Sequence, residues 1–76
     1  MTFSTSDEPR DVEIREESIR LGQLLKLADL VDNGAEVKTL LMQGMVFVNG
    51  EMEIRRGRQL VKGDVVTLGE QSVRVA

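Results

Sequence analysis

The spacing of apolar residues along this chain changes at Gly44, from a helical period to the alternation of strands. Upstream, apolar residues recur at intervals of three and four, first at Leu21, Leu24, Leu25 and Ala28 and then at Val37, Leu40 and Leu41. Such intervals place side chains on one face of a helix. The pattern therefore predicts two short helices, which we expect to pack antiparallel.

The ends of the second helix carry recognisable signals. Asn33 can cap its first turn, and Glu36 three positions later completes a capping box, in which each side chain satisfies a backbone N–H of the other residue. Gly44 can adopt the left-handed conformation that commonly follows a helix. We therefore predict a helix that begins after Asn33 and ends before Gly44.

The segment after Gly44 alternates with a period of two. Asn49-Gly50 lies in the middle of it and favours a type I′ turn, because both central residues of that turn need a positive φ. The predicted hairpin has Val46 and Val48 on its first strand and Met52 and Ile54 on its second. Phe47 is out of phase with the two valines, so we expect it to face outward.

The rest of the chain supplies shorter strands and turns. Leu60 is predicted to enter the core, Lys62–Asp64 to form a turn, and Val65–Leu68 to form a strand. Gly69–Gln71 should then turn the chain into a last strand at Ser72–Val75.

The N-terminal part has a different composition. Met1–Asp11 is too polar to repay the entropy of ordering, so we predict a flexible acidic tail there and a single domain over residues 12–76. Val12 and Ile14 alternate with charged residues, which is typical of a short, half-exposed edge strand. A chain of 76 residues has room for one compact core.

The composition excludes several kinds of chemistry. The chain has neither cysteine nor histidine, so disulfides, thiolate metal sites and the commonest general base are not available. Its glycines match neither nucleotide-binding fingerprint, and no serine or threonine has a histidine to activate it. We therefore expect no enzyme activity, cofactor or metal. No secretory signal or membrane span is predicted, so we expect a cytoplasmic monomer.

The charge is unevenly distributed. The net charge is −3, but residues 1–18 carry six acidic and two basic side chains, whereas eight basic residues oppose seven acidic ones from residue 19 onward. Positive charge is concentrated in one loop, which holds Arg55, Arg56 and Arg58 around Gly57. Guanidinium groups at this density can bind successive phosphates through charge-assisted, bidentate hydrogen bonds. Binding of a polyanion would thus depend on local clustering rather than on net charge.

The loop also has a plain structural interpretation. Glu51 and Glu53 could pair with Arg55 or Arg56 and leave an ordinary solvated turn. From the residues alone the two interpretations are about equally favoured. Lys38 also has two interpretations, an ordinary exposed lysine or a cation near a helix N-terminus that favours anions, and the first is favoured from this residue alone.

The order of these parts resembles a known family. Helix, loop, helix with a basic residue in its first turns, then Gly44–Gly50, the basic loop and Leu60–Val66 are similar to the S4-type RNA-binding domain, or αL motif. The chain resembles in particular the stand-alone, single-domain bacterial YbcJ-like branch, in which an arginine-rich loop follows the hairpin. The resemblance implies an α+β fold with two short helices packed on one side of a small bent antiparallel sheet.

The resemblance also implies a function. It suggests a small non-catalytic protein of translation or ribosome assembly that recognises structured RNA, either rRNA or tRNA, and associates with the ribosome or an RNA-modifying enzyme. The RNA contacts that we predict are Lys38, Arg55, Arg56 and Arg58, with Lys26 and Lys62 as outer contacts. Many family members have Ser or Thr followed by Arg near the start of the second helix, whereas this chain has Asn33–Lys38.

A rival hypothesis from another class is a protein-interaction adaptor, or an accessory subunit of an RNA-modifying or translation complex. In that case an outward-facing Phe47 and the acidic tail would contact the partner, while the arginines would pair with its carboxylates.

Overall fold

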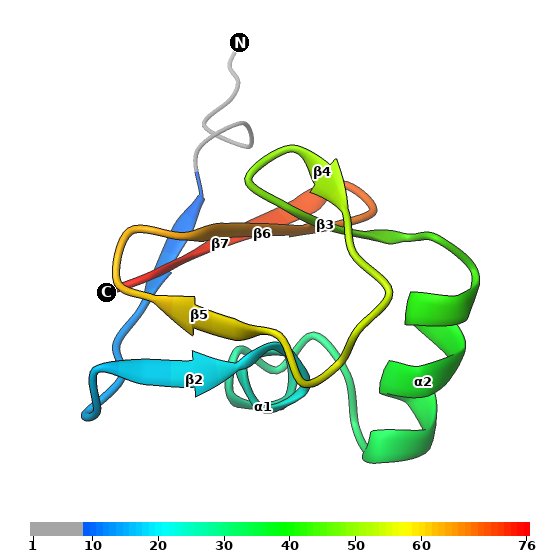
Figure 1. Ribbon diagram of the computed structural model, residues 1–76, viewed down its shortest axis with the longest axis horizontal. Helices are drawn as coiled ribbons and strands as arrows, with labels where there is room; N and C mark the ends of the chain where they lie inside the picture. Colours follow the sequence, from blue (N-terminus) through cyan, green and yellow to red (C-terminus); the bar gives the residue numbers. More distant parts are fainter. Residues whose placement is uncertain (1–8) are drawn as a thin grey trace, which may run out of the picture.

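A computed structural model describes residues 9–76 as a small α+β fold in which two helices lie on one side of a five-stranded sheet (Figure 1). The sheet has the order β1-β7-β6-β3-β4. Its strands are β1 (Arg10–Val12), β3 (Val46–Val48), β4 (Glu51–Met52), β6 (Val65–Leu68) and β7 (Gln71–Val75). A separate two-stranded ribbon joins β2 (Ser18–Arg20) to β5 (Gln59–Val61). The predicted α+β fold class is confirmed, but the sheet is mixed rather than purely antiparallel, because β1 pairs in parallel with β7.

The N-terminal tail was predicted to extend to Asp11, and most of it lies outside the described residues. At its end, Arg10 and Asp11 belong to β1, which pairs in parallel with β7 at the edge of the sheet. Arg74 holds this edge through an ion pair of 2.8 Å from its Nη2 to Asp11 Oδ1. The predicted edge strand at Val12 and Ile14 is therefore displaced toward the N-terminus and ends at Val12.

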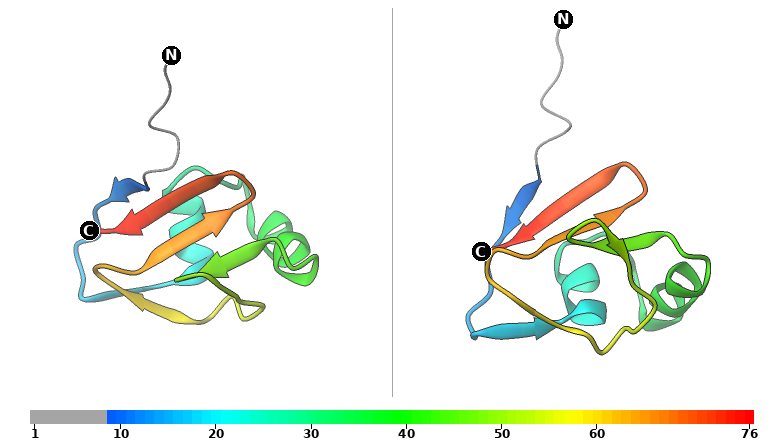
Figure 2. Two further views of the ribbon diagram at one scale, coloured as in Figure 1. Left: turned by 90° about the horizontal axis from the view of Figure 1, so that it is seen from above. Right: turned by 45° about the horizontal axis from the view of Figure 1, so that its top comes forward.

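The two predicted helices are confirmed as α1 (Leu21–Leu27) and α2 (Gly34–Met42). The apolar face of α1 is fully buried, as are Val37 and Leu41 of α2, whereas Leu40 is half-buried. The prediction that the two helices pack antiparallel was wrong. The view that shows one helix end-on shows the other from the side, so their axes are steeply crossed (Figures 1 and 2). The crossing leaves the N-terminal ends of both helices near the loop between β4 and β5 (Figure 1).

The predicted cap of α2 is confirmed, with one difference. Asn33 Oδ1 accepts a hydrogen bond of 2.9 Å from the N–H of Glu36. The carboxylate of Glu36 reaches back to the N–H of Asp32 at 2.7 Å rather than to that of Asn33. Glu36 thus satisfies a donor one residue earlier than in a standard capping box.

The predicted hairpin forms between β3 and β4. Asn49 and Gly50 have φ of 52° and 88°, as a type I′ turn requires, and Val48 pairs with Glu51. Phe47 lies opposite Met52 on the outer face and is 37% exposed, as expected. The returning strand is shorter than predicted, because it ends at Met52.

The β2–β5 ribbon is the main element that the sequence did not predict. Ile19 pairs with Leu60, whose burial in the core is confirmed. Each strand is only three residues long, and a period of two is not distinguishable over so short a stretch. The ribbon holds the start of α1 beside the end of the basic loop, because β2 leads into α1 and β5 follows the loop.

The turn predicted at Lys62–Asp64 is confirmed and is tied to the hairpin. Asp64 accepts hydrogen bonds from Asn49 Nδ2 at 3.1 Å and from the N–H of Val61 at 2.9 Å. Asn49 Oδ1 in turn accepts from the N–H of Val65 at 2.9 Å. The strands predicted after this turn are confirmed as β6 and β7.

No helix in residues 9–76 has the length and apolar character needed to cross a membrane.

Candidate functional site

The basic loop between β4 and β5 is attached to the start of α1. The N–H groups of Leu21 and Gly22 donate to the carbonyl oxygens of Arg58 and Arg56 at 2.8 and 2.9 Å. The first N–H groups of a helix have no partner within the helix, so the loop supplies acceptors that α1 needs. A Cβ added at Gly22 would lie 3.6 Å from Cβ and O of Arg56, which is ordinary van der Waals contact, so the loop packs directly against the start of α1. The loop therefore has a fixed backbone.

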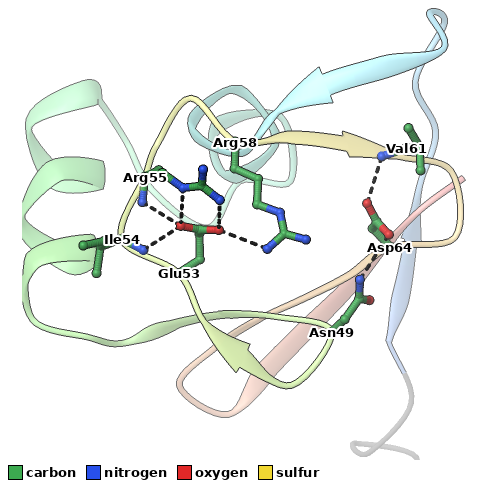
Figure 3. A network of polar contacts seen from close by, with 7 residues as sticks. All are labelled: Asn49, Glu53, Ile54, Arg55, Arg58, Val61 and Asp64. Carbon is green, nitrogen blue, oxygen red and sulfur yellow. Dashed lines mark hydrogen bonds and ion pairs between the residues drawn. The ribbon is translucent and has the colours of Figure 1, made fainter.

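Glu53 organises the side chains of this loop from within (Figure 3). The residue is 6% exposed, and its carboxylate accepts from the backbone N–H groups of Ile54 and Arg55, both at 3.0 Å. It also accepts from Nε and Nη2 of Arg55 at 3.1 and 3.2 Å and from Nη1 of Arg58 at 3.0 Å. Hydrogen bonds from the side chain and backbone of Arg55 outweigh the effect of burial and lower the pKa of Glu53 to about 2. The two backbone donors, Ile54 and Arg55, lie after the end of β4 at Met52.

The sequence had suggested that the three arginines act as one outward-facing unit. The bonds to Glu53 show that they do not. Glu53 engages Arg55 and Arg58, although the Arg55 side chain remains 73% exposed and that of Arg58 30%. Within residues 9–76, the ion pairs involve Arg55, Arg58 and Arg74, and Arg56 takes part in none of them. Of the two interpretations of the loop, pairing with an acidic residue holds for Arg55 and Arg58 but not for Arg56.

Arg56 lies beside a hollow between the two helices. This hollow, of about 260 Å³, is lined by Arg20 at the start of α1, Lys26 in its last turn, and Arg56 with Gly57 from the loop. Gly34 from the first turn of α2 completes one wall, but the carboxylate of Glu36 in the same turn offsets the partial positive charge of that helix end. Arg20 was not among the predicted site residues.

A second hollow, of about 400 Å³, lies on the other side of Arg56. Its lining combines Arg56 and Lys38 with three apolar residues, Leu41, Met42 and Ile54. Among the described residues, no acidic side chain lines either hollow. Arg56 therefore connects Arg20 and Lys26 on one side with Lys38 on the other. We call these four exposed residues the cationic face.

Lys62 does not belong to the cationic face. It lies in the β5–β6 turn, at the end of the molecule opposite α2 in both orientations (Figures 1 and 2). A third hollow beyond Lys26 has a mixed lining, in which Glu13 and Glu16 accompany Arg15 and Lys26. The structure thus brings Lys26, Lys38 and Arg56 together from the predicted set.

Two residues of the site were missed by sequence reasoning, for different reasons. Arg20 precedes the first helical leucine, and its distance from Arg56 in the sequence gave no sign that the two share a hollow. Glu53 was considered only as a surface partner of the arginines. The signal that could have identified it is its alternation with Glu51, which places one of these two acids on the inner side of the hairpin strand.

Fold and site together define a small α+β domain with a cationic face built from two helices and the loop after a hairpin. The sequence model of the S4 domain family matches residues 12–76 of this chain. The chain therefore belongs to the S4 domain family. It is 47% identical over 57 residues to the probable ribosome maturation protein RlbA of Bacillus subtilis, covering 75% of this chain and 80% of that protein. It is 32% identical over 74 residues to the putative RNA-binding protein YbcJ of Escherichia coli, covering 97% and 94%. The predicted resemblance is confirmed.

Proposed function

We propose that this chain is a non-catalytic RNA-binding protein that recognises structured RNA, rRNA or tRNA, through the cationic face, and that it works in ribosome assembly or translation. Membership of the S4 domain family supports the proposal. So do the names of the two relatives, one of which is described as an RNA-binding protein and the other as a ribosome maturation protein.

The observation that carries the proposal is the position of Arg56 between two hollows that have cations and no lining acids in the described part of the chain. A guanidinium at this junction can form a bidentate contact with one phosphate, while Lys26 and Lys38 supply point charges for its neighbours. Such an arrangement follows a sugar-phosphate chain better than it fits a single small anion.

Phosphate and shape recognition also fits the aromatic content of the chain. It has no Tyr or Trp and two Phe, and Phe47 lies on the face of β3 opposite the buried Val46 and Val48. Stacking of successive bases on aromatic side chains, the common mode for single strands, is therefore not supported at the cationic face. The RNA is expected to be folded, with its backbone presented to Arg56.

We expect Arg56→Gln and Lys38→Gln each to weaken binding to a short RNA hairpin by roughly fivefold at 0.1 M salt, because each loses one phosphate contact. Each should also reduce the slope of log affinity against log salt by up to about 1. Fluorescence anisotropy over a salt series measures both quantities.

The matched control is Lys62→Gln, which removes the same charge at the opposite end of the molecule. Its affinity and salt slope should equal those of the wild type. Equal losses of affinity in all three variants would mean that net charge alone drives binding. The assignment of RNA binding to the cationic face would then be wrong.

A further inference from the structure

The hollow between Arg56 and Lys38 differs from its neighbour in being largely apolar. Leu41 is 2% exposed and forms part of its floor, whereas Met42 and Ile54 are 75% and 64% exposed. Ile54 lies on the side of the loop that faces α2 (Figure 3). Single exposed apolar residues are common on protein surfaces, but here two large ones share a hollow whose lining also includes the cations Lys38 and Arg56.

We propose that this hollow takes one unpaired nucleobase of the RNA, and that the flanking phosphates lie against Arg56 and Lys38. The inference rests on the proposed function and names the part of the RNA that this end of the face reads. A base has two apolar faces, and the flexible thioether of Met42 can adapt to them and contact an aromatic ring favourably. Ile54 would cover the other face of the base.

Continuity and charge favour a nucleobase over other occupants. Arg56 lines both hollows, so a strand whose phosphate lies beside Arg20 and Lys26 would bring its next nucleotide to Met42 and Ile54. The two cations at the rim suit a polyanion better than an apolar peptide. Because bases inside an A-form helix are stacked and their major-groove edges lie deep, only a base from a bulge, loop or end could enter.

The test uses three RNA hairpins with one common stem. The first is fully paired, the second has a single bulged adenosine, and the third has an abasic nucleotide in the bulge, so that the second and third have equal numbers of phosphates. Wild-type protein should bind the adenosine bulge about three- to tenfold more tightly than the abasic bulge. Fluorescence anisotropy at fixed salt measures this ratio.

The variants Met42→Gln and Ile54→Thr should bring the ratio close to one while leaving affinity for the abasic hairpin and the salt slope unchanged. Both residues are exposed, so their replacement is expected to leave the fold intact. Val61→Thr is the matched control for Ile54→Thr, because Val61 is 52% exposed on β5 and does not line the hollow. It should keep the wild-type ratio.

Equal binding of the adenosine and abasic hairpins by the wild type would overturn the inference. A preference that survives in both variants would overturn it too, since the base would then be read elsewhere. Failure of the proposed function looks different, because none of the three hairpins would then show salt-dependent binding.

Discussion

The carboxylate of Glu53 divides the neighbouring arginines into two groups with different tasks. Arg55 and Arg58 bind it, and these bonds fix the loop, while Arg56 stays free of acidic partners within the described residues. Replacing all three arginines at once would therefore remove structural contacts together with the proposed RNA contact. Arg56 alone separates binding from folding.

The low pKa of Glu53 makes its contribution to stability dependent on pH. Folding lowers this pKa from 4.5 to about 2, so the ionised carboxylate stabilises the fold above pH 4.5. That stabilisation is lost as pH falls from 4.5 toward 2, because in this range the unfolded state binds the proton while the folded state does not.

We expect Glu53→Gln to lower the free energy of unfolding by about 2 kcal/mol at pH 7, since the amide cannot satisfy all the donors around it. The difference from wild type should shrink as the pH approaches 2. Urea unfolding across this pH range measures it, with Glu51→Gln as the control, because Glu51 is exposed and makes no ion pair within residues 9–76. A difference that stays constant down to pH 2 would contradict the account.

At the scale of elements, the connection between α2 and β3 depends on Gly44. Its φ of +72° lies in the left-handed region, where side chains are strained. An added Cβ would also lie 2.9 Å from Sδ of Met52 on the returning strand. Gly44 therefore lets the chain leave the helix and enter the sheet directly beside the hairpin.

Gly44→Ala should destabilise the fold by about 1 to 2 kcal/mol, mostly through backbone strain, because the end of the Met52 side chain can move. Gly57→Ala is the control, since Gly57 lies outside the left-handed region and an added Cβ would meet no heavy atom within 4 Å. Its free energy of unfolding should stay within about 0.5 kcal/mol of wild type. Equal effects of the two substitutions in denaturant unfolding would show that the conformation of Gly44 is not what matters.

At the scale of the whole molecule, the elements with strong local signals could be predicted from the sequence. Both helices follow from their leucine spacing, and the β3–β4 hairpin follows from Asn49-Gly50. The β2–β5 ribbon could not be predicted, because its register joins residues about forty positions apart through strands of three residues. The crossing of the helices also depends on packing against the sheet rather than on either helix alone.

The site was predictable in composition but not in arrangement. Lys38 and Arg56 were identified by charge and order, and the structure places them on one hollow. The separate roles of Arg55 and Arg58 depend on the burial of Glu53, which is a property of the folded loop. Likewise, Lys62 is close to the loop in sequence and distant in space, because β5 carries it away.

The central claim is that RNA lies across the cationic face of a chain whose net charge is −3. Amide chemical shifts of the ¹⁵N-labelled full chain, followed as a bulged RNA hairpin is added, test it most directly. The account predicts the largest changes at Arg20–Lys26, Gly34–Lys38 and Arg56–Gly57, together with Met42 and Ile54 where the bulged base enters, and little change at Lys62–Asp64. Largest changes at the β5–β6 turn, or around Phe47 on the outer face of the sheet, would contradict it.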